Sequence, residues 1–398
     1  MKKYTLIICV ALIALSSWGV FVYTKQTMPL PAPVHAPRPP EKMPMPAPKP
    51  HPYIPVEIIL PAIQASVMPS IAQVTARSPK VFAYAHGTIV ADGKIFLGMA
   101  AAAGNRFQAN QLTIFNAADI SRPTFVSVPM QGEIDTIIYD AVNDRIYFEL
   151  SNNGGLHIFS LDPHTYAVSV IVSTTTVDVG RRPAIVTDGM YVYGITNTTP
   201  SSVFKVKIRG GELTVNKNGH IPNGHSAAIG IYASSTELYF GGGMMNGFEK
   251  VDAATLESTA STTIGPCAMS DDMPHVQTGP REGYVYIGCE TVPYGVRVST
   301  GDMSFDRFQL PGASLGLFVY GHDLYNAAQD GYIDAFPNAD LTDLRRYRVT
   351  DDVAPFDTKG QSLEPNEILY SPETSKLYFT AWLGIEGLYQ VSTSTPSV

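Results

Sequence analysis

Seven polar residues of this 398-residue sequence could do chemistry, because each lies at or just before the start of a short apolar stretch. Neutral imidazole is a good ligand for zinc and copper, and carboxylate, guanidinium, hydroxyl and amide groups recognise polar molecules. Brought together, they would form a polar or metal-binding site; the alternative is a hydrated polar surface with no ligand. The residues are His86, Asp135, Arg182, His225, His275, Ser314 and Asn366.

The sequence contains none of the local motifs that mark common enzymes. It has no G-x-S-x-G, no H-E-x-x-H, no P-loop and no C-x-x-C. We therefore predict no catalytic residue and no cofactor, with a metal at the seven polar positions as the alternative. Residues 1–55 carry six basic residues and one acidic residue, a net of +5, so residues 56–398 carry −13 of the total −8. An acidic body has the wrong charge for a phosphate backbone, which excludes nucleic acid.

The elements that would position the seven residues form a repeat. Short strands with an aromatic or apolar centre recur from Phe96 to Tyr378, a distance of 282 positions or six intervals averaging 47. A β-type repeat of about 40–50 residues is the signature of a β-propeller. We predict an all-β fold, a seven-bladed β-propeller over 56–398, with the seven polar residues starting the inner strands at an axial funnel. The strand centres, predicted to lie in the core between blades, are Phe96, Tyr147, Val192, Tyr239, Tyr286, Tyr325 and Tyr378.

The last repeat, ending in 388–394, has no outer strand of its own. A strand from the beginning of the body, near 56–60 or 70–75, would supply it and close the ring. This pairing would remove the open edge that an incomplete blade leaves.

Two cysteines fall at opposite ends of neighbouring strands in the fifth repeat. Cys267 precedes the inner strand and Cys289 ends the middle strand. Antiparallel pairing puts the start of one strand beside the end of the next, so we predict a disulfide between them. An oxidising compartment outside the cytoplasm favours such a bond.

The N-terminus indicates attachment to a membrane. Lys2 and Lys3 precede an uncharged run over 4–23, and a helix of 20 residues is about 30 Å long, enough to cross a bilayer. We predict a signal-anchor helix over 1–26 with the body outside the cytoplasm, at the periplasm or cell surface; cleavage of this segment would instead secrete the protein. Residues 27–55 are rich in proline and form a predicted disordered linker.

One repeat resembles a known family. Residues 179–186, VGRRPAIV, followed by residues 188–197, DGMYVYGITN, are similar to a YVTN-type repeat. The resemblance implies a seven-bladed propeller of the broad YVTN or quinoprotein-dehydrogenase-like group, which holds binding proteins and enzymes alike. No repeat ends in Trp-Asp, which disfavours a WD40 protein.

These observations favour a membrane-tethered, extracytoplasmic propeller that binds or scaffolds proteins or cell-envelope ligands without catalysis. Its partners would be the membrane, through the N-terminal helix, and an envelope protein or cell-wall polymer. The alternatives are a lactonase-like hydrolase or cofactor-dependent dehydrogenase that uses the axial funnel, and a sensor of a small ligand. A bound metal or cofactor would distinguish the enzyme from the scaffold.

Overall fold

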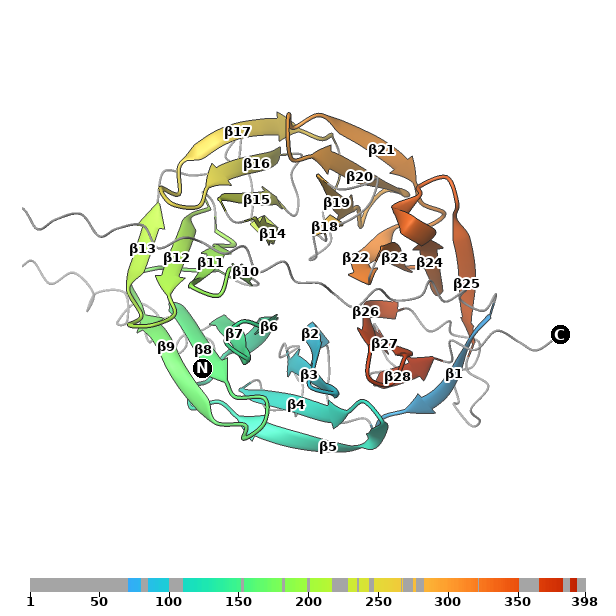
Figure 1. Cartoon of the computed structure of the whole chain (residues 1–398), viewed down its shortest axis with the longest axis horizontal. Helices are drawn as coiled ribbons and strands as arrows, with labels where there is room; N and C mark the ends of the chain where they lie inside the picture. Colours follow the sequence, from blue (N-terminus) through green and yellow to red (C-terminus); the bar gives the residue numbers. More distant parts are fainter. Residues whose placement is uncertain are drawn as a thin grey trace, which may run out of the picture. The chain divides into compact units, whose positions relative to one another are not determined.

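The computed structural model arranges the chain as a ring of β-sheets around a central axis (Figure 1). The predicted anchor (1–26) and linker (27–55) lie outside the residues that it describes. Within the described part, no helix is long and apolar enough to span a membrane. The structure describes residues 71–391 with gaps at 80–84, 100–109, 152–153, 181–182, 199–200, 217–227, 235, 243–246, 266, 268–274, 277–282, 321, 351–364 and 382–386.

The strands group into seven blades, each of four antiparallel strands, numbered here from the N-terminus. Blades I to III are β2 (Ala85–Ala91), β3 (Lys94–Met99), β4 (Gln111–Asn116) and β5 (Asp119–Ser127); β6 (Glu133–Asp140), β7 (Arg145–Ser151), β8 (Leu156–Leu161) and β9 (Val168–Thr174); and β10 (Ala184–Thr187), β11 (Tyr191–Ile195), β12 (Val203–Lys207) and β13 (Leu213–Asn216). Blades IV and V are β14 (Ala228–Ala233), β15 (Glu237–Gly242), β16 (Gly247–Asp252) and β17 (Ser258–Thr263); and β18 (His275–Val276), β19 (Tyr284–Gly288), β20 (Tyr294–Ser299) and β21 (Phe305–Gln309).

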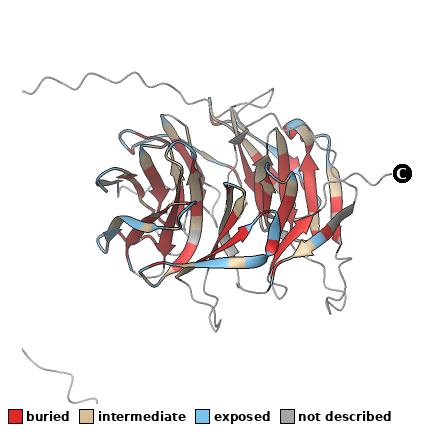
Figure 2. Ribbon diagram, turned by 60° about the horizontal axis from the view of Figure 1, so that its bottom comes forward, coloured by how far each residue is buried: buried red, intermediate tan, exposed pale blue. Residues whose placement is uncertain are grey.

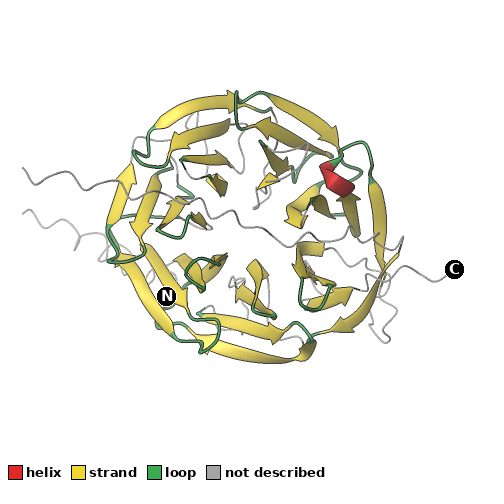
Figure 3. Cartoon of the chain, viewed as in Figure 1, coloured by secondary structure: helices red, strands yellow, loops and turns green. Residues whose placement is uncertain are grey.

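Blades VI and VII complete the ring. Blade VI is β22 (Ser314–Tyr320), β23 (Asp323–Ala328), β24 (Tyr332–Phe336) and β25 (Arg345–Thr350), with the short 3₁₀ helix η1 (Pro337–Ala339) between the last two. Blade VII takes β26 (Pro365–Ser371), β27 (Lys376–Ala381) and β28 (Leu388–Val391) from the C-terminus and β1 (Ile71–Arg77) from the N-terminus. The prediction of an all-β, seven-bladed β-propeller is confirmed. Figure 3 shows the strands and the turns that join them.

The second and third strands of the blades are mostly buried, whereas outer strands such as β5 and β17 are largely exposed (Figure 2). Strand β7 is buried at six of its seven positions, while every position of β17 is exposed or half-buried. This difference arises because neighbouring blades cover both faces of a middle strand, and the outer strand faces water. Tyr378 of blade VII shares one apolar cluster with Ile95 and Leu97 of blade I. The predicted core between blades is confirmed.

The ring closes through its N-terminal strand. Val74 of β1 is paired with Val391 of β28 in antiparallel register, so β1 becomes the outer strand of blade VII. Closure by a strand near 70–75 is therefore confirmed, and the alternative at 56–60 lies outside the described residues. Strand β1 also pairs in parallel with β25, where Ile71 is opposite Arg348. The closing strand thus connects blade VII to blade VI as well, which the sequence did not predict.

The disulfide between Cys267 and Cys289 is confirmed, with 5.0 Å between the two Cα atoms. Both residues are buried. The carbonyl of Cys289 accepts a 2.9 Å hydrogen bond from the N–H of Ser314, where β22 begins. The disulfide therefore fixes the point at which blade V meets blade VI.

Candidate functional site

The seven polar residues singled out in the sequence lie on inner strands wherever the structure describes their backbone. Ser314 is fully buried at the start of β22. The side chains of the other six lie outside the described residues, as does the whole of Arg182 and His225, so the axial funnel stays a prediction. The remaining four backbones belong to strands that surround the axis in Figure 1: His86 in β2, Asp135 in β6, His275 in β18 and Asn366 in β26.

The polar groups that the structure brings together lie at the other end of the inner strands. We call this end the turn face; it carries the turn after the first strand of each blade and the turn after the third strand of blades I to VI. In blades I and II these are residues 92–93 and 117–118, and residues 141–144 and 162–167. Turns that come from distant parts of the sequence become neighbours here because adjacent blades pack side by side.

Four of the turns after the third strand share one five-residue form. In each, the N–H of the fifth residue donates to the carbonyl of the first over 2.8–3.1 Å, and the fifth residue has a positive φ of 60–66°. A turn closed in this way holds its middle residues outward in a fixed position. The four turns are 162–166 in blade II, 207–211 in blade III, 252–256 in blade IV and 299–303 in blade V.

A lysine of the preceding blade binds three of these turns. The Nζ atom of Lys94 lies 3.3 Å from the carbonyl oxygen of Pro163. The same contact joins Lys205 to Ala253 at 3.3 Å and Lys250 to Thr300 at 3.2 Å. In each case the acceptor is the second residue of the turn. These contacts fix each turn to the blade before it, so the turn face is tied together around this part of the ring.

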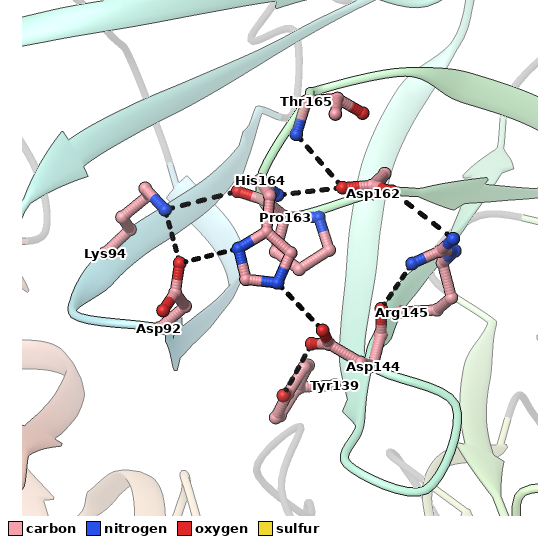
Figure 4. A network of polar contacts seen from close by, with 9 residues as sticks. All are labelled: Asp92, Lys94, Tyr139, Asp144, Arg145, Asp162, Pro163, His164 and Thr165. Atoms are coloured by element: carbon pink, nitrogen blue, oxygen red, sulfur yellow. Dashed lines mark hydrogen bonds and ion pairs between the residues drawn. The ribbon is translucent and has the colours of Figure 1, made fainter.

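His164, the third residue of the blade II turn, connects blades I and II (Figure 4). Its Nε2 lies 2.8 Å from Oδ2 of Asp144 in its own blade, and its Nδ1 lies 3.0 Å from Oδ2 of Asp92 in blade I. The hydrogen bond with Asp144, and the charges of both carboxylates, raise the pKa of His164. The ammonium group of Lys94, 2.6 Å from Asp92, is the main cause that lowers the pKa of that carboxyl.

The rest of this network pairs charges with one another. The hydroxyl of Tyr139 donates to Asp144 over 2.9 Å, and burial followed by this contact raises the pKa of Tyr139 to about 12. Arg145 lies 3.3 Å from Asp162, whose other oxygen accepts the N–H of Thr165 at 3.0 Å. The network therefore pairs charges across the junction between blades I and II.

A pocket of about 450 Å³ lies on the same face, between blades IV and V. The third turn residue of blade V is Gly301, so no side chain stands where His164 stands in blade II. Lys250 lines the pocket, and its Nζ lies 2.7 Å from Oε1 of Glu237. The lining residues are Thr236, Glu237, Lys250, Asp252, Thr259, Ala260, Gly301, Asp302 and Met303.

No three His, Cys, Asp or Glu side chains are arranged to hold a metal ion in the described part of the chain. Asp340 and Asp343, in an acidic turn of blade VI, have protein partners: the N–H of Thr342 at 3.0 Å and Arg345 at 3.1 Å. A metal at the axial funnel concerns side chains outside that part and stays untested.

Sequence reasoning missed the turn face because its partners come from different repeats. The signal is nevertheless present in the sequence. If the repeats are aligned on the turn after the third strand, its third residue changes from His164 to Arg209, Ala254 and Gly301 in successive blades. The third residue of this turn therefore distinguishes a junction between blades that a side chain fills from a junction that is open.

No family model and no curated protein matches the sequence. Solved structures do match, and they are propellers: a chain of the mitotic checkpoint complex aligns at 13% identity and a TM-score of 0.59, over 83% of this chain and 96% of that one. The WD40 domain of Neurospora crassa Pan2 aligns at 9% identity and 0.58, over 79% and 90%. Chaetomium thermophilum Raptor aligns at 9% identity and 0.57, over 83% of this chain and 30% of its own.

The chain is therefore a seven-bladed β-propeller, and identities this low establish the fold alone. A WD40 domain shares the architecture even though no repeat here ends in Trp-Asp. The sequence argument against WD40 proteins thus concerned a local motif and does not extend to the arrangement of the blades. The YVTN resemblance is matched by no family model and stays a prediction.

Proposed function

We propose that this protein is a non-catalytic binding or scaffold module, held outside the cytoplasm by an N-terminal anchor and a proline-rich stalk. The observation that carries the proposal is that lysine side chains on the turn face bind the turns of neighbouring blades. Lys94, Lys205 and Lys250 fix turns of neighbouring blades, which makes this face a rigid set of loops. Loops on a rigid scaffold are where binding sites concentrate.

The similar structures support a binding role at the level of the fold. One of them was crystallised as the mitotic checkpoint complex, in which a propeller is part of a larger assembly. The tether rests on the sequence alone: the uncharged run over 4–23, preceded by two lysines, and the many prolines over 27–55. A YVTN-type repeat is compatible with this function, since that group includes binding proteins.

Chemical crosslinking of the full-length protein in its native membranes tests the proposal. The tagged protein is crosslinked, purified and analysed by mass spectrometry, with a parallel purification without crosslinker as the control. We expect one envelope protein at near-stoichiometric yield only in the crosslinked sample. A clean protein without a partner, or recovery of the chain from the soluble cytoplasm, would overturn the tethered scaffold.

A further inference from the structure

We propose that the pocket between blades IV and V binds a basic side chain, arginine or lysine, of a partner protein. The inference rests on the proposed binding function and names the chemistry of the partner. Two observations carry it: at another junction the third turn residue is a basic side chain of this chain held between two carboxylates, and the pocket beside Gly301 is lined by an excess of carboxylates, which come from other positions of the blades.

The first observation is an internal template. At the junction of blades I and II, the third turn residue is His164, whose ring lies between the carboxylates of Asp92 and Asp144. At the junction of blades IV and V, a turn with the same closing hydrogen bond has Gly301 at the third position. The molecule thus places a protonatable ring in one junction and leaves the equivalent position of the other without a side chain.

The turn does not need glycine at this position. The φ of Gly301 is outside the left-handed region that favours glycine. A Cβ built there would find its nearest neighbour, Oγ of Ser299, at 3.7 Å, which is ordinary van der Waals contact. Neither backbone strain nor crowding accounts for the glycine. Gly301 lines the open pocket, which is about 450 Å³ in volume.

The charge of the lining selects the ligand. Among the described residues, Glu237, Asp252 and Asp302 line the pocket together with one cation, Lys250, which leaves a net charge of two negative units. Oδ1 of Asp252 accepts hydrogen bonds from the N–H of Ala254 at 3.0 Å and from the N–H and hydroxyl of Thr255 at 2.7 and 3.0 Å, which leaves Oδ2 without a hydrogen-bond donor among the described residues. A guanidinium or ammonium group would be attracted here, whereas phosphate and carboxylate ligands would be repelled.

The remaining walls suit the stem of a long basic side chain. Met303 and Ala260 add apolar surface beside the carboxylates. Arginine and lysine bury their methylene stems against apolar surface while the charged end reaches polar groups. A bare metal ion fits less well, because a lysine ammonium already lies among the carboxylates and no three metal-ligating side chains converge in the described part of the chain.

Isothermal titration of the full-length protein in detergent with the peptide acetyl-Gly-Arg-Gly-amide tests the pocket directly. The matched peptide carries citrulline, which has the same shape as arginine but no charge. We expect saturable binding of the arginine peptide, weakened about tenfold or more for citrulline. Equal affinity for the two peptides, or no binding of either, would overturn the inference.

Variants locate the binding. Gly301→His should introduce a ring at the turn position that His164 occupies in blade II and abolish binding of the arginine peptide, while Gly301→Ala should retain binding.

Asp302→Asn should weaken binding about threefold to tenfold, as expected for loss of one exposed charge pair. Asp119→Asn removes the same charge from the exposed start of β5 in blade I and should change nothing. Thermal melting checks that each variant is folded; if Gly301→His is not, the Asp302→Asn comparison decides. Unchanged binding in that variant would contradict the proposed pocket.

Crosslinking of the Gly301→His chain in native membranes separates this inference from the proposed function. Loss of a partner that the wild-type chain captures supports both. Equal capture by the two chains overturns the pocket and leaves the scaffold intact. Binding of the arginine peptide without any captured partner supports the pocket and overturns the scaffold.

Discussion

Nδ1 of His164 lies 3.0 Å from Oδ2 of Asp92, so an imidazole of blade II is paired with a carboxylate of blade I. Its Nε2 is held by Asp144 of its own blade at 2.8 Å. A ring that contacts a carboxylate through each nitrogen is stabilised in its protonated form, in which both nitrogens donate. The protonation of this one side chain is therefore linked to the junction between two blades.

The two described histidines of blade II should titrate in opposite directions from the ordinary value of about 6.5. The pKa of His164 is raised by Asp144 and Asp92, whereas burial lowers the pKa of His157. Because the folded-state pKa of His164 is raised, its stabilising contribution is complete below the unfolded pKa and is lost as pH rises through the folded pKa. Imidazole resonances followed by NMR across this range measure both values.

Asp92→Asn is the matched variant for this titration. Removing that charge should move the pKa of His164 back toward its ordinary value and leave His157 unchanged. The pKa of Asp92 is itself lowered, by Lys94 first and then by His164, so its share of the stabilisation is lost only as the solution becomes acidic. A His164 that titrates at or below about 6.5 in the wild-type protein would contradict the contact.

Tyr378→Phe should lower the free energy of unfolding by about 1–3 kcal/mol, because it leaves a buried acceptor unpaired. The Tyr378 hydroxyl of blade VII donates to the carbonyl oxygen of Ala117 in blade I, and both residues are buried. Tyr166→Phe is the control, since its hydroxyl has no hydrogen bond to the described residues and its loss should change stability by less than about 0.5 kcal/mol. Equal urea denaturation curves for the two variants would show that the bond between blades contributes nothing.

The repeat, the blade number, the closing strand and the disulfide could all be predicted because each depends on order along the chain. A middle strand is covered on both faces, so its apolar centre recurs with every blade, as at Tyr147 and Tyr239. A final blade without an outer strand leaves an edge that only an earlier segment can cover. Cys267 precedes β18 and Cys289 directly follows β19, and the antiparallel pairing of these two strands brings those ends of the hairpin to the same side.

The turn face could not be predicted in the same way, because it depends on which side chains neighbouring repeats place together. His164 stands in a turn whose sequence is ordinary for a β-hairpin, and its partner Asp92 belongs to another blade. No spacing within one repeat reveals that pair. The pocket is harder still to predict, because the only indication in the sequence is a glycine, Gly301, at a turn position where another blade has a side chain.

Replacing both Cys267 and Cys289 by alanine should cost about 3 kcal/mol of unfolding free energy, because the bond closes a loop of 22 residues in the unfolded chain. Guanidinium denaturation measures the loss, and adding reductant to the wild-type protein should reproduce it. Alkylation of the unfolded, unreduced chain should label one of its three cysteines, and all three after reduction. The same alkylation is then applied to the protein from native cells quenched with acid, and the same pattern is expected if the propeller resides in an oxidising compartment. Labelling of all three cysteines without reduction would place the propeller in a reducing compartment.

Val74→Asp should destabilise the ring by more than about 3 kcal/mol, because it buries an unpaired charge in the closing strand. Val74 is 1% exposed, is paired with Val391 and packs in one apolar cluster with Tyr389. Val170→Asp is the matched control: the same change in an outer strand at a position 53% exposed should alter stability by less than about 0.5 kcal/mol.

Thermal melting compares the stability of the two variants, and limited proteolysis locates the place where the ring opens. Cleavage of the Val74→Asp chain should begin near β1 and β28, since blade VII alone combines the two ends of the described chain. A melting temperature close to that of the Val170→Asp chain would mean that the ring holds together without its closing strand.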